Sequence, residues 1–470
     1  MTDPTHSFAA PERQPAGSGS PERGRLLARE RIYARALAAA RPIMPLLGRL
    51  DPKLARGVEG REGAVARLQH WAATARESAR PLVWVHAPSV GEGLMAQAII
   101  STLRERAPEG AKPQIAFTHF SPSAERLAAR IGADVADYLP WDLPGDVQRV
   151  LEALRPDLIA YVRTEAWPVL SALAARAGAR LALVNAVLSQ GSSRLRGHSR
   201  FLLGPTYRRL DAVGAVAEAD AYRFRRLGVE PERVKVTGDA RFDQVWQRVQ
   251  ALVGEGGEHR NEPLLARLRQ PHVTTLIAGS TWPADEERLV PAFARAREAS
   301  RVSGALWRLI VAPHEPDERH LQPLEERLSE AGLAHARLAE IEAGAALPEV
   351  VVVDRVGVLA DLYSVGTLAY VGGGFHSAGL HSVVEPAALA LPVIFGPRHG
   401  NAREADELED AGGGFEVSDG AELESCLTEL TSGGSAPGSR TRAAAAALEY
   451  VRSRLGGAAA NADLLLRLLG

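Results

Sequence analysis

Short apolar segments alternate with helical segments along most of this chain, and this alternation constrains the fold more than any other feature of the sequence. One series of apolar segments begins at Pro81-Leu-Val-Trp-Val-His86, and a second begins at Val273-Thr-Thr-Leu-Ile-Ala278. Strands that alternate with helices form parallel sheets with helices on both faces. The sequence therefore predicts an α/β protein with two Rossmann-like, doubly wound domains that face each other across a ligand-binding cleft.

The composition is that of an ordinary soluble protein. The chain has 470 residues, enough for two or three domains, and its formal net charge of -2 gives no general attraction for nucleic acid. Its single cysteine, Cys426, excludes a disulfide framework and a cysteine-based zinc site. No apolar run reaches membrane-spanning length and no signal-peptide pattern opens the chain, so we expect a cytoplasmic protein.

Shifts in composition divide the chain into segments. Residues 1–24 are rich in Pro, Gly and Ser and are predicted to form a disordered tail. Residues 25–50 predict a basic amphipathic helix, broken at Pro42, that either lies on an anionic membrane or packs on its own domain. The expected segments are an N-terminal domain over 25–245, a linker over 246–270, a C-terminal domain over 271–448 and a helix crossing back over 449–470.

Polar residues follow the strands of the first series. Glu92 lies at a strand-to-helix turn between Gly91 and Gly93, where a carboxylate can take a proton from an attacking hydroxyl. The alternative is a solvated glutamate that the helix dipole favours. Because parallel strands place their carboxyl ends at one edge of the sheet, an acceptor site is expected there. Its residues would be Ser89, Gly91, Glu165, Asn185, Ser189, Arg194 and Arg196.

In the second series, a strand ending at Val371 runs into Gly372-Gly-Gly374 and a loop with two histidines. Ser382 is expected to cap a helix over 383–391, which carries Glu385 in its first turn. Backbone N–H groups of such a turn suit a phosphate, and Glu385 can reach sugar hydroxyls. The residues of this series expected to hold a phosphate-bearing ligand, which the resemblance described below implies is a sugar donor, are Ser280, Thr281, Pro313, His314, Arg319, Gly373, Gly374, His381, Ser382 and Glu385. The sequence shows no paired aspartates or closely spaced histidines typical of a metal site, so no metal is expected.

Several widely separated motifs occur in the order found in one family. They are Val85–Glu92, Tyr138–Gly145, Arg155–Leu158, Thr164–Pro168, Val184–Ser189, Val236–Asp243 and Glu385–Leu389. With these motifs, the chain resembles the 3-deoxy-D-manno-octulosonic acid (Kdo) transferases, which are inverting GT-B glycosyltransferases of lipopolysaccharide synthesis. The resemblance runs from about Arg56 to Val417.

The resemblance implies transfer of Kdo from CMP-Kdo to a hydroxyl of a lipid A precursor, lipid IVA, without metal or cofactor. The protein would act as a peripheral protein on the cytoplasmic face of the inner membrane. Glu92 matches the catalytic base, and His381 and Glu385 match positions that hold CMP. Pro313 and His314 match a Pro-Arg-His segment without its arginine, which Arg319 would replace.

This chain departs from the family's pattern at three places. The usual hydrophobic anchor is replaced by the amphipathic residues 25–50. The usual Gly-Gly-His-Asn-Pro run is replaced by Gly379-Leu-His381-Ser-Val383, and Gln190-Gly191 stands where a basic residue is common. Two alternatives therefore stay open: a nucleotide-sugar epimerase of the same fold, and a non-catalytic relative that acts as a binding module.

Overall fold

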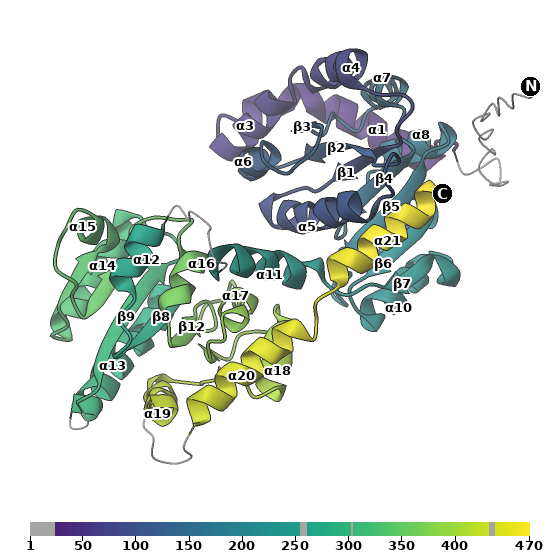
Figure 1. Ribbon diagram of the computed structural model, residues 1–470. Coiled ribbons are helices and arrows are strands. Elements are labelled where there is room, and N and C mark those ends of the chain that lie inside the picture. The colour runs from purple at the N-terminus through teal and green to yellow at the C-terminus, as the bar shows by residue number, and fades with distance from the viewer. Residues whose placement is uncertain (1–23, 254–260, 302–303, 432–437) are drawn as a thin grey trace, which may run out of the picture. The chain divides into compact units, whose positions relative to one another are not determined.

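The computed structural model describes residues 24–253, 261–301, 304–431 and 438–470 (Figure 1). The predicted tail, apart from Gly24, lies outside these ranges. The chain forms two compact units, one made of Met1–Arg241 with Gly456–Gly470 and the other of Phe242–Leu455. None of the helices in the described ranges combines the length and hydropathy of a membrane span.

Within the described residues, the first unit contains one seven-stranded parallel sheet, in the order β3-β2-β1-β4-β5-β6-β7. Its strands are β1 Leu82–His86, β2 Gln114–His119, β3 Val135–Tyr138, β4 Leu158–Val162, β5 Arg180–Ala186, β6 Ala212–Ala215 and β7 Val234–Val236. The order reverses between β1 and β4, and ligands of such sheets bind beyond the carboxyl ends of the strands at this reversal.

Alternate residues of the central strands face two separate cores, so both faces of the first sheet are covered. On one face, Trp84 and Tyr161 pack with α4 (Ala64–Ala75), α7 (Pro144–Leu154) and α8 (Pro168–Arg176). On the other, Val83 and Val85 pack with α5 (Val90–Arg106) and α21 (Gly457–Leu469), which contact each other (Figure 1). The fold of this unit is therefore doubly wound.

The segment predicted as a basic amphipathic helix is broken where expected. It forms α1 (Ala28–Ala40), a 3-10 turn with Pro42 (Arg41–Ile43) and the short α2 (Met44–Leu47), before α3 (Pro52–Arg61). Glu30 of α1 is fully buried and forms an ion pair with Arg209. The first part of the segment therefore packs on its own unit, whereas Ile43, Leu46, Leu47 and Leu50 are exposed.

The second unit repeats the architecture, with a seven-stranded parallel sheet among its described residues in the order β10-β11-β9-β8-β12-β13-β14. Its strands are β8 Val273–Thr281, β9 Leu306–Pro313, β10 His335–Arg337, β11 Val350–Val352, β12 Leu368–Val371, β13 Val393–Phe395 and β14 Gly414–Glu416. The helices α13 (Pro283–Ser300), α14 (Glu318–Glu330) and α19 (Gly420–Thr431) cover one face. The other face carries α11, α12, α15 to α18 and α20, whose bounds are Ala240–Val253, Glu262–Leu268, Leu338–Glu342, Leu359–Leu362, Val384–Ala388, Arg403–Asp410 and Ser439–Arg452.

Two predicted segment boundaries are wrong. The predicted linker, residues 246–270, is not a linker in its described part, because the units divide between Arg241 and Phe242. Phe242, Val245 and Val249 pack one face of α11 into the second unit's core, and α12 buries its leucines there too. The glycines that suggested a linker, at 254, 256 and 257, lie outside the described residues.

The predicted returning helix, 449–470, is two helices. α20 packs Tyr450 and Val451 into the second unit, and the chain then turns at Gly456, whose φ of 107° is left-handed. Only α21 returns to the first unit, where Leu464 and Leu465 are buried.

Candidate active site

Glu92 lies in the first turn of α5, at the reversal of strand order in the first unit. The Ser89 hydroxyl, at the N-cap position, donates to the Glu92 carboxylate. Gly91 is exposed, and a Cβ there would meet nothing nearer than the Ser89 oxygen at 3.9 Å. Gly93 instead faces the core, where a Cβ would lie 2.6 Å from Leu127. The open space beside the carboxylate is therefore due to Gly91 and not to Gly93.

Glu165 follows β4, the neighbour of β1, and is electrostatically coupled to Glu92. Burial raises the pKa of Glu165, the Arg194 guanidinium lowers it, and the Glu92 carboxylate raises it further. The loop is fixed because the Thr164 hydroxyl donates to the Val187 carbonyl at 2.9 Å and the Tyr207 hydroxyl donates to the Thr164 carbonyl at 2.6 Å. Two carboxylates, one of them held beside an arginine, thus gather at this edge of the sheet.

The remaining predicted acceptor residues divide into exposed and buried positions. Ser189 and Arg196 are exposed, and Arg196 donates to the Gly191 carbonyl at 2.7 Å. Asn185 is fully buried, and its amide binds the Asp239 carboxylate at 3.1 Å and the Ala240 N–H at 2.7 Å. Both ends of this side chain are therefore engaged in the fold, which corrects its predicted role in acceptor binding.

His86, at the end of β1, is also structural. Its ring is fully buried, and its Nδ1 lies 3.1 Å from the Thr118 hydroxyl. Burial lowers the pKa of His86 to about 3, so the ring is neutral at physiological pH. A ring that stays neutral is not a proton-transfer group at physiological pH, although its Nε2 has no hydrogen-bond partner among the described residues.

The glycine-rich loop of the second unit is shaped by close packing. A Cβ at Gly372 would collide with the Ser280 carbonyl, and a Cβ at Gly374 would lie 2.5 Å from the Gly396 nitrogen. The Gly373 N–H, predicted to face a phosphate, donates instead to the Asp285 carboxylate at 2.8 Å. The three glycines are required by the neighbouring backbone, and at Gly373 the predicted free donor is already used.

Asp285 connects this loop to the start of α13. Its carboxylate, fully buried, accepts hydrogen bonds from the Gly373 N–H, the Trp282 N–H at 2.9 Å and the Tyr370 hydroxyl at 2.9 Å. The sequence indicated only an acidic helix start here. The structure shows that Asp285 fixes the loop that carries the donor-binding candidates.

A stack of aromatic rings stands beside that loop. Trp282 lies between His376, with ring centroids 4.0 Å apart, and His314, at 4.7 Å, and His314 contacts His381 at 4.5 Å. Burial lowers the pKa of His381, and the neighbouring His314 lowers it further. Sequence reasoning found His314 and His381 but missed Trp282, because a tryptophan after a strand looks like any other core residue.

Three buried polar atoms of this region, Trp282 Nε1, His381 Nε2 and the Ser382 hydroxyl, have no hydrogen-bond partner among the described residues. Buried polar atoms are almost always bonded, so these three are available to a ligand. Ser382 does not cap the next helix as predicted: the N-cap of α17 is Val383, and the helix covers Val384–Ala388 rather than 383–391.

The other residues predicted to bind the donor show no unpartnered buried side-chain atom among the described residues. The buried Thr281 hydroxyl donates to Glu286 at 2.8 Å and is engaged in the fold, whereas Ser280 has a left-handed φ of 55°. Pro313 ends β9 opposite Thr281, and Glu385 lies half-buried near Tyr363. Arg319 is exposed in the first turn of α14 and is not gathered with the rings.

The side chains of Glu315, Asp317 and His320 place three possible metal-ligand atoms within 4.8 Å of one another. The sequence did not indicate this cluster. Asp317 caps α14 and binds His320 Nδ1 at 2.8 Å, so the group already has a structural explanation. Exposed acidic groups of this kind are common without an ion.

The chain has two Rossmann-like units. Carboxylates gather at the carboxyl edge of the first unit's sheet, and a glycine-rich loop follows a strand of the second unit's sheet. These features define a GT-B protein. Solved structures agree on the fold: UDP-GlcNAc 2-epimerase from Neisseria meningitidis matches with a TM-score of 0.59 and 14% identity, over 83% of this chain and 100% of that chain. A putative UDP-N-acetylglucosamine 2-epimerase from Listeria monocytogenes matches with a TM-score of 0.54 and 14% identity, over 82% and 95%.

Sequence comparisons identify the family. The profile described as 3-deoxy-D-manno-octulosonic-acid transferase (kdotransferase) matches residues 62–244. The 3-deoxy-D-manno-octulosonic acid transferase of Bordetella pertussis is 30% identical over 385 residues, 78% of this chain and 83% of the relative. The transferase of Aquifex aeolicus is 28% identical over 360 residues, 74% and 86%. The chain belongs to the Kdo transferase family and is a glycosyltransferase, as the motifs predicted.

Proposed function

We propose that this protein transfers Kdo from CMP-Kdo to a hydroxyl of a lipid A precursor, lipid IVA, by a single displacement that inverts the anomeric carbon. Glu92 takes the proton of the acceptor hydroxyl while its oxygen bonds to the anomeric carbon of Kdo. The bond from that carbon to the CMP phosphate breaks, and CMP leaves with the electron pair. No metal or cofactor takes part in this scheme.

The position of Glu92 carries the proposal. A general base must reach the proton it abstracts, and Glu92 stands in the first turn of α5 beside the exposed Gly91. Ser89 orients its carboxylate, and Glu165 with Arg194 supplies the charged surroundings. Glu165, Arg194, Ser189 and Arg196 are proposed to contact the acceptor.

The donor is proposed to bind the second unit. His381 Nε2 and the Ser382 hydroxyl are unpaired in the described structure and can donate to the oxygens of a phosphate. His314, which follows β9, and Glu385, on α17 after the loop that leaves β12, are proposed to contact the nucleotide, with Glu385 on its ribose.

Association with the cytoplasmic face of the inner membrane is proposed through the break between α1 and α3. Ile43, Leu46, Leu47 and Leu50 form a short exposed apolar patch, and Leu50 is 85% exposed. Arg49 and Lys53 lie beside it in the sequence. Apolar residues flanked by basic ones bind anionic lipid surfaces.

Transfer of labelled Kdo from CMP-Kdo, generated in situ, to tetraacylated lipid IVA tests the proposal. We expect product from the wild type and loss of product with Glu92→Gln, while CMP binding is unchanged. Free Kdo or an epimerised sugar without acceptor would contradict transfer. Donor binding without turnover on any acceptor would instead support a binding module.

A further inference from the structure

Two arginines of the first unit are buried at similar depth but in different surroundings. Arg209 is 5% exposed and binds the Glu30 carboxylate. Arg61, at the end of α3, is 7% exposed, and no carboxylate forms an ion pair with it among the described residues. A buried charge without a counter-ion is costly, so the position of Arg61 needs an explanation.

Aromatic rings and backbone carbonyls surround Arg61. Its guanidinium donates to the Gly57 and Phe120 carbonyls at 2.6 and 2.9 Å, and its central carbon lies 3.8 Å from the Phe120 ring centroid and 5.4 Å from that of Trp141. Burial lowers the pKa of Arg61 to about 10, which leaves it a cation at neutral pH. Rings attract a cation but do not neutralise it.

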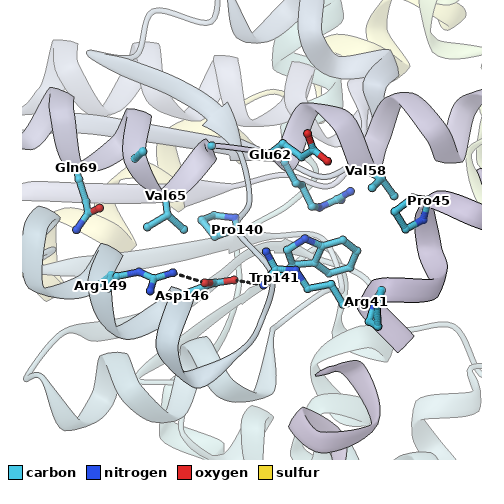
Figure 2. A pocket seen from close by; sticks show the side chains of 14 residues that line it. Arg41, Pro45, Val58, Glu62, Val65, Gln69, Pro140, Trp141, Asp146 and Arg149 are labelled. Atoms are coloured by element: carbon cyan, nitrogen blue, oxygen red, sulfur yellow. Dashed lines mark hydrogen bonds and ion pairs between the residues drawn. The ribbon is translucent and has the colours of Figure 1, made fainter. Parts of the chain in front are cut away.

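Arg61 forms part of the walls of two adjoining cavities. One, of about 410 Å³, is mainly apolar and is lined by Leu37, Met44, Leu54, Phe120 and Trp167 among others. The other, of about 570 Å³, carries Arg41 and Arg149, and Figure 2 shows both bonded to Asp146, with Trp141 and Pro140 beside them. Arg61, Val58, Pro140 and Trp141 line both cavities. Volumes of this size are those of ligand pockets.

The apolar cavity lies beside the candidate active site. The N–H groups of Phe120 and Ser121 donate to the Pro88 carbonyl at 3.1 and 2.8 Å, and Pro88 directly precedes Ser89, which binds Glu92. The loop that supplies Glu165 also supplies Trp167, whose ring stacks on Phe120 with centroids 5.5 Å apart. A molecule in this cavity would thus be held by the same loops that place the carboxylates.

The cavity also continues the exposed apolar patch of α2. Met44 lines the cavity, whereas Leu46 and Leu47 of the same short helix face solvent. An apolar chain that enters from a lipid surface would therefore pass from one set of apolar side chains to the next.

We infer that the apolar cavity takes one acyl chain of the acceptor lipid and that Arg61 pairs with a phosphate on the acceptor's sugar. This inference rests on the proposed function, because it assumes an acylated, phosphorylated acceptor. The phosphate of the bound acceptor would then be the counter-ion that Arg61 lacks among the described residues of the free protein. Arg41 and Arg149, on the side where the phosphate would lie, are already bonded to Asp146, so Arg61 is the cation assigned to the phosphate.

The acyl part is tested by narrowing the cavity. Leu54→Trp replaces a half-buried leucine of the cavity wall with a larger side chain. The matched control is Leu306→Trp, at an exposed position of the second unit. We expect Leu54→Trp to raise the KM for tetraacylated acceptor by at least about tenfold and to leave kcat, CMP binding and the KM for a deacylated acceptor unchanged. Equal effects on both acceptors, or none, would overturn the acyl site.

The phosphate part is tested with Arg61→Gln and Arg61→Lys against acceptors with and without phosphate. Arg61→Gln should raise the KM for the phosphorylated acceptor about tenfold and hardly change that for the dephosphorylated one, and Arg61→Lys should recover part of the loss. A purely structural role would weaken both acceptors alike, and this result would overturn the pairing.

A measurement without turnover separates this inference from the proposed function. Dibromostearate, a fatty acid that quenches tryptophan fluorescence on contact, should quench the wild type more than Trp167→Phe. If the wild type transferred Kdo to no acceptor, the proposed function would be wrong. The quenching would still show whether an acyl chain enters the apolar cavity. Equal quenching of the wild type and Trp167→Phe would overturn the acyl site.

Discussion

The carboxyl edges of the two sheets carry opposite chemistry. In the first unit, Glu92 and Glu165 stand half-buried beside Arg194, and their charges influence each other. In the second, the rings of Trp282 and three histidines line the edge, and Asp285 is used entirely by the fold. The same architecture thus presents carboxylates beside an arginine at one edge and aromatic rings with a serine hydroxyl at the other.

This difference separates proton transfer from anion binding. A base needs a carboxylate that is accessible and charged, which the first edge provides. A phosphate is held by N–H and O–H donors, and the second edge provides His381 Nε2 and the Ser382 hydroxyl, which have no partner among the described residues. Variants at each edge should therefore change different measured quantities.

The largest effect is expected from Glu92→Gln. Loss of a general base lowers kcat by roughly 10²–10⁴-fold, and the CMP dissociation constant should not change, because the base lies in the other unit. Single-turnover transfer and calorimetric titration with CMP measure the two quantities. Glu59→Gln, at an exposed glutamate of α3, is the control. A normal kcat for Glu92→Gln would show that the first edge does not supply the general base.

Asp285→Asn should act on the second edge through stability. An amide has one acceptor oxygen for the three donors that Asp285 now serves, so buried donors are left unsatisfied at a cost of about 1–3 kcal/mol. Urea unfolding should show this loss, and CMP should bind more weakly because the glycine loop is no longer fixed. Asp419→Asn, at an exposed helix start, should cost less. Unchanged stability and CMP affinity would contradict the role of Asp285.

His86 predicts a pH effect on stability, not on chemistry. Its pKa is about 3 in the folded protein and 6.5 in the unfolded chain, so the unfolded state binds the additional proton between these values. Stability is therefore complete above pH 6.5 and falls as the pH drops below it, by up to about 1.4 kcal/mol per pH unit. Unfolding free energies of wild type and His86→Gln between about pH 7 and pH 5 measure this difference. Parallel pH profiles would show that His86 is not the cause.

The smallest effect is expected from Ser382→Ala. Because its hydroxyl has no partner in the described structure, its removal should leave the free protein as stable as the wild type. CMP should bind about fivefold more weakly, the value of one hydrogen bond. Ser377→Ala, in the same loop, is the control. A stability loss with unchanged CMP binding would show that the hydroxyl serves the fold.

The α/β fold, most of the strands and the place of Glu92 in the first turn of a helix were predictable from the sequence, because alternating apolar segments and a Gly-Glu-Gly turn are local patterns. The order of the strands in the two sheets was not predicted, because it is set by tertiary packing. Asn185 and Thr281 were predicted to bind ligands, but their side chains bind Asp239 and Glu286 instead. The sequence did not indicate these partners, because tertiary packing brings them together. The glycine loop looked like an anion cradle, yet its glycines are required because backbone atoms of Ser280, Gly379 and Gly396 leave no room for a Cβ. Arg61 gave no signal, since only the structure shows a cation enclosed by rings.

The discontinuity of the first unit affects the timing of its folding. During synthesis the strands of its sheet leave the ribosome long before α21, which fills part of its core and whose Asn461 receives the Asn185 N–H at 3.0 Å. The first unit must therefore wait, with Leu464 and Leu465 missing, until the whole second unit has been made. Until then the part of its apolar face that α21 covers stays exposed beside α5, and exposed apolar surface during folding favours aggregation.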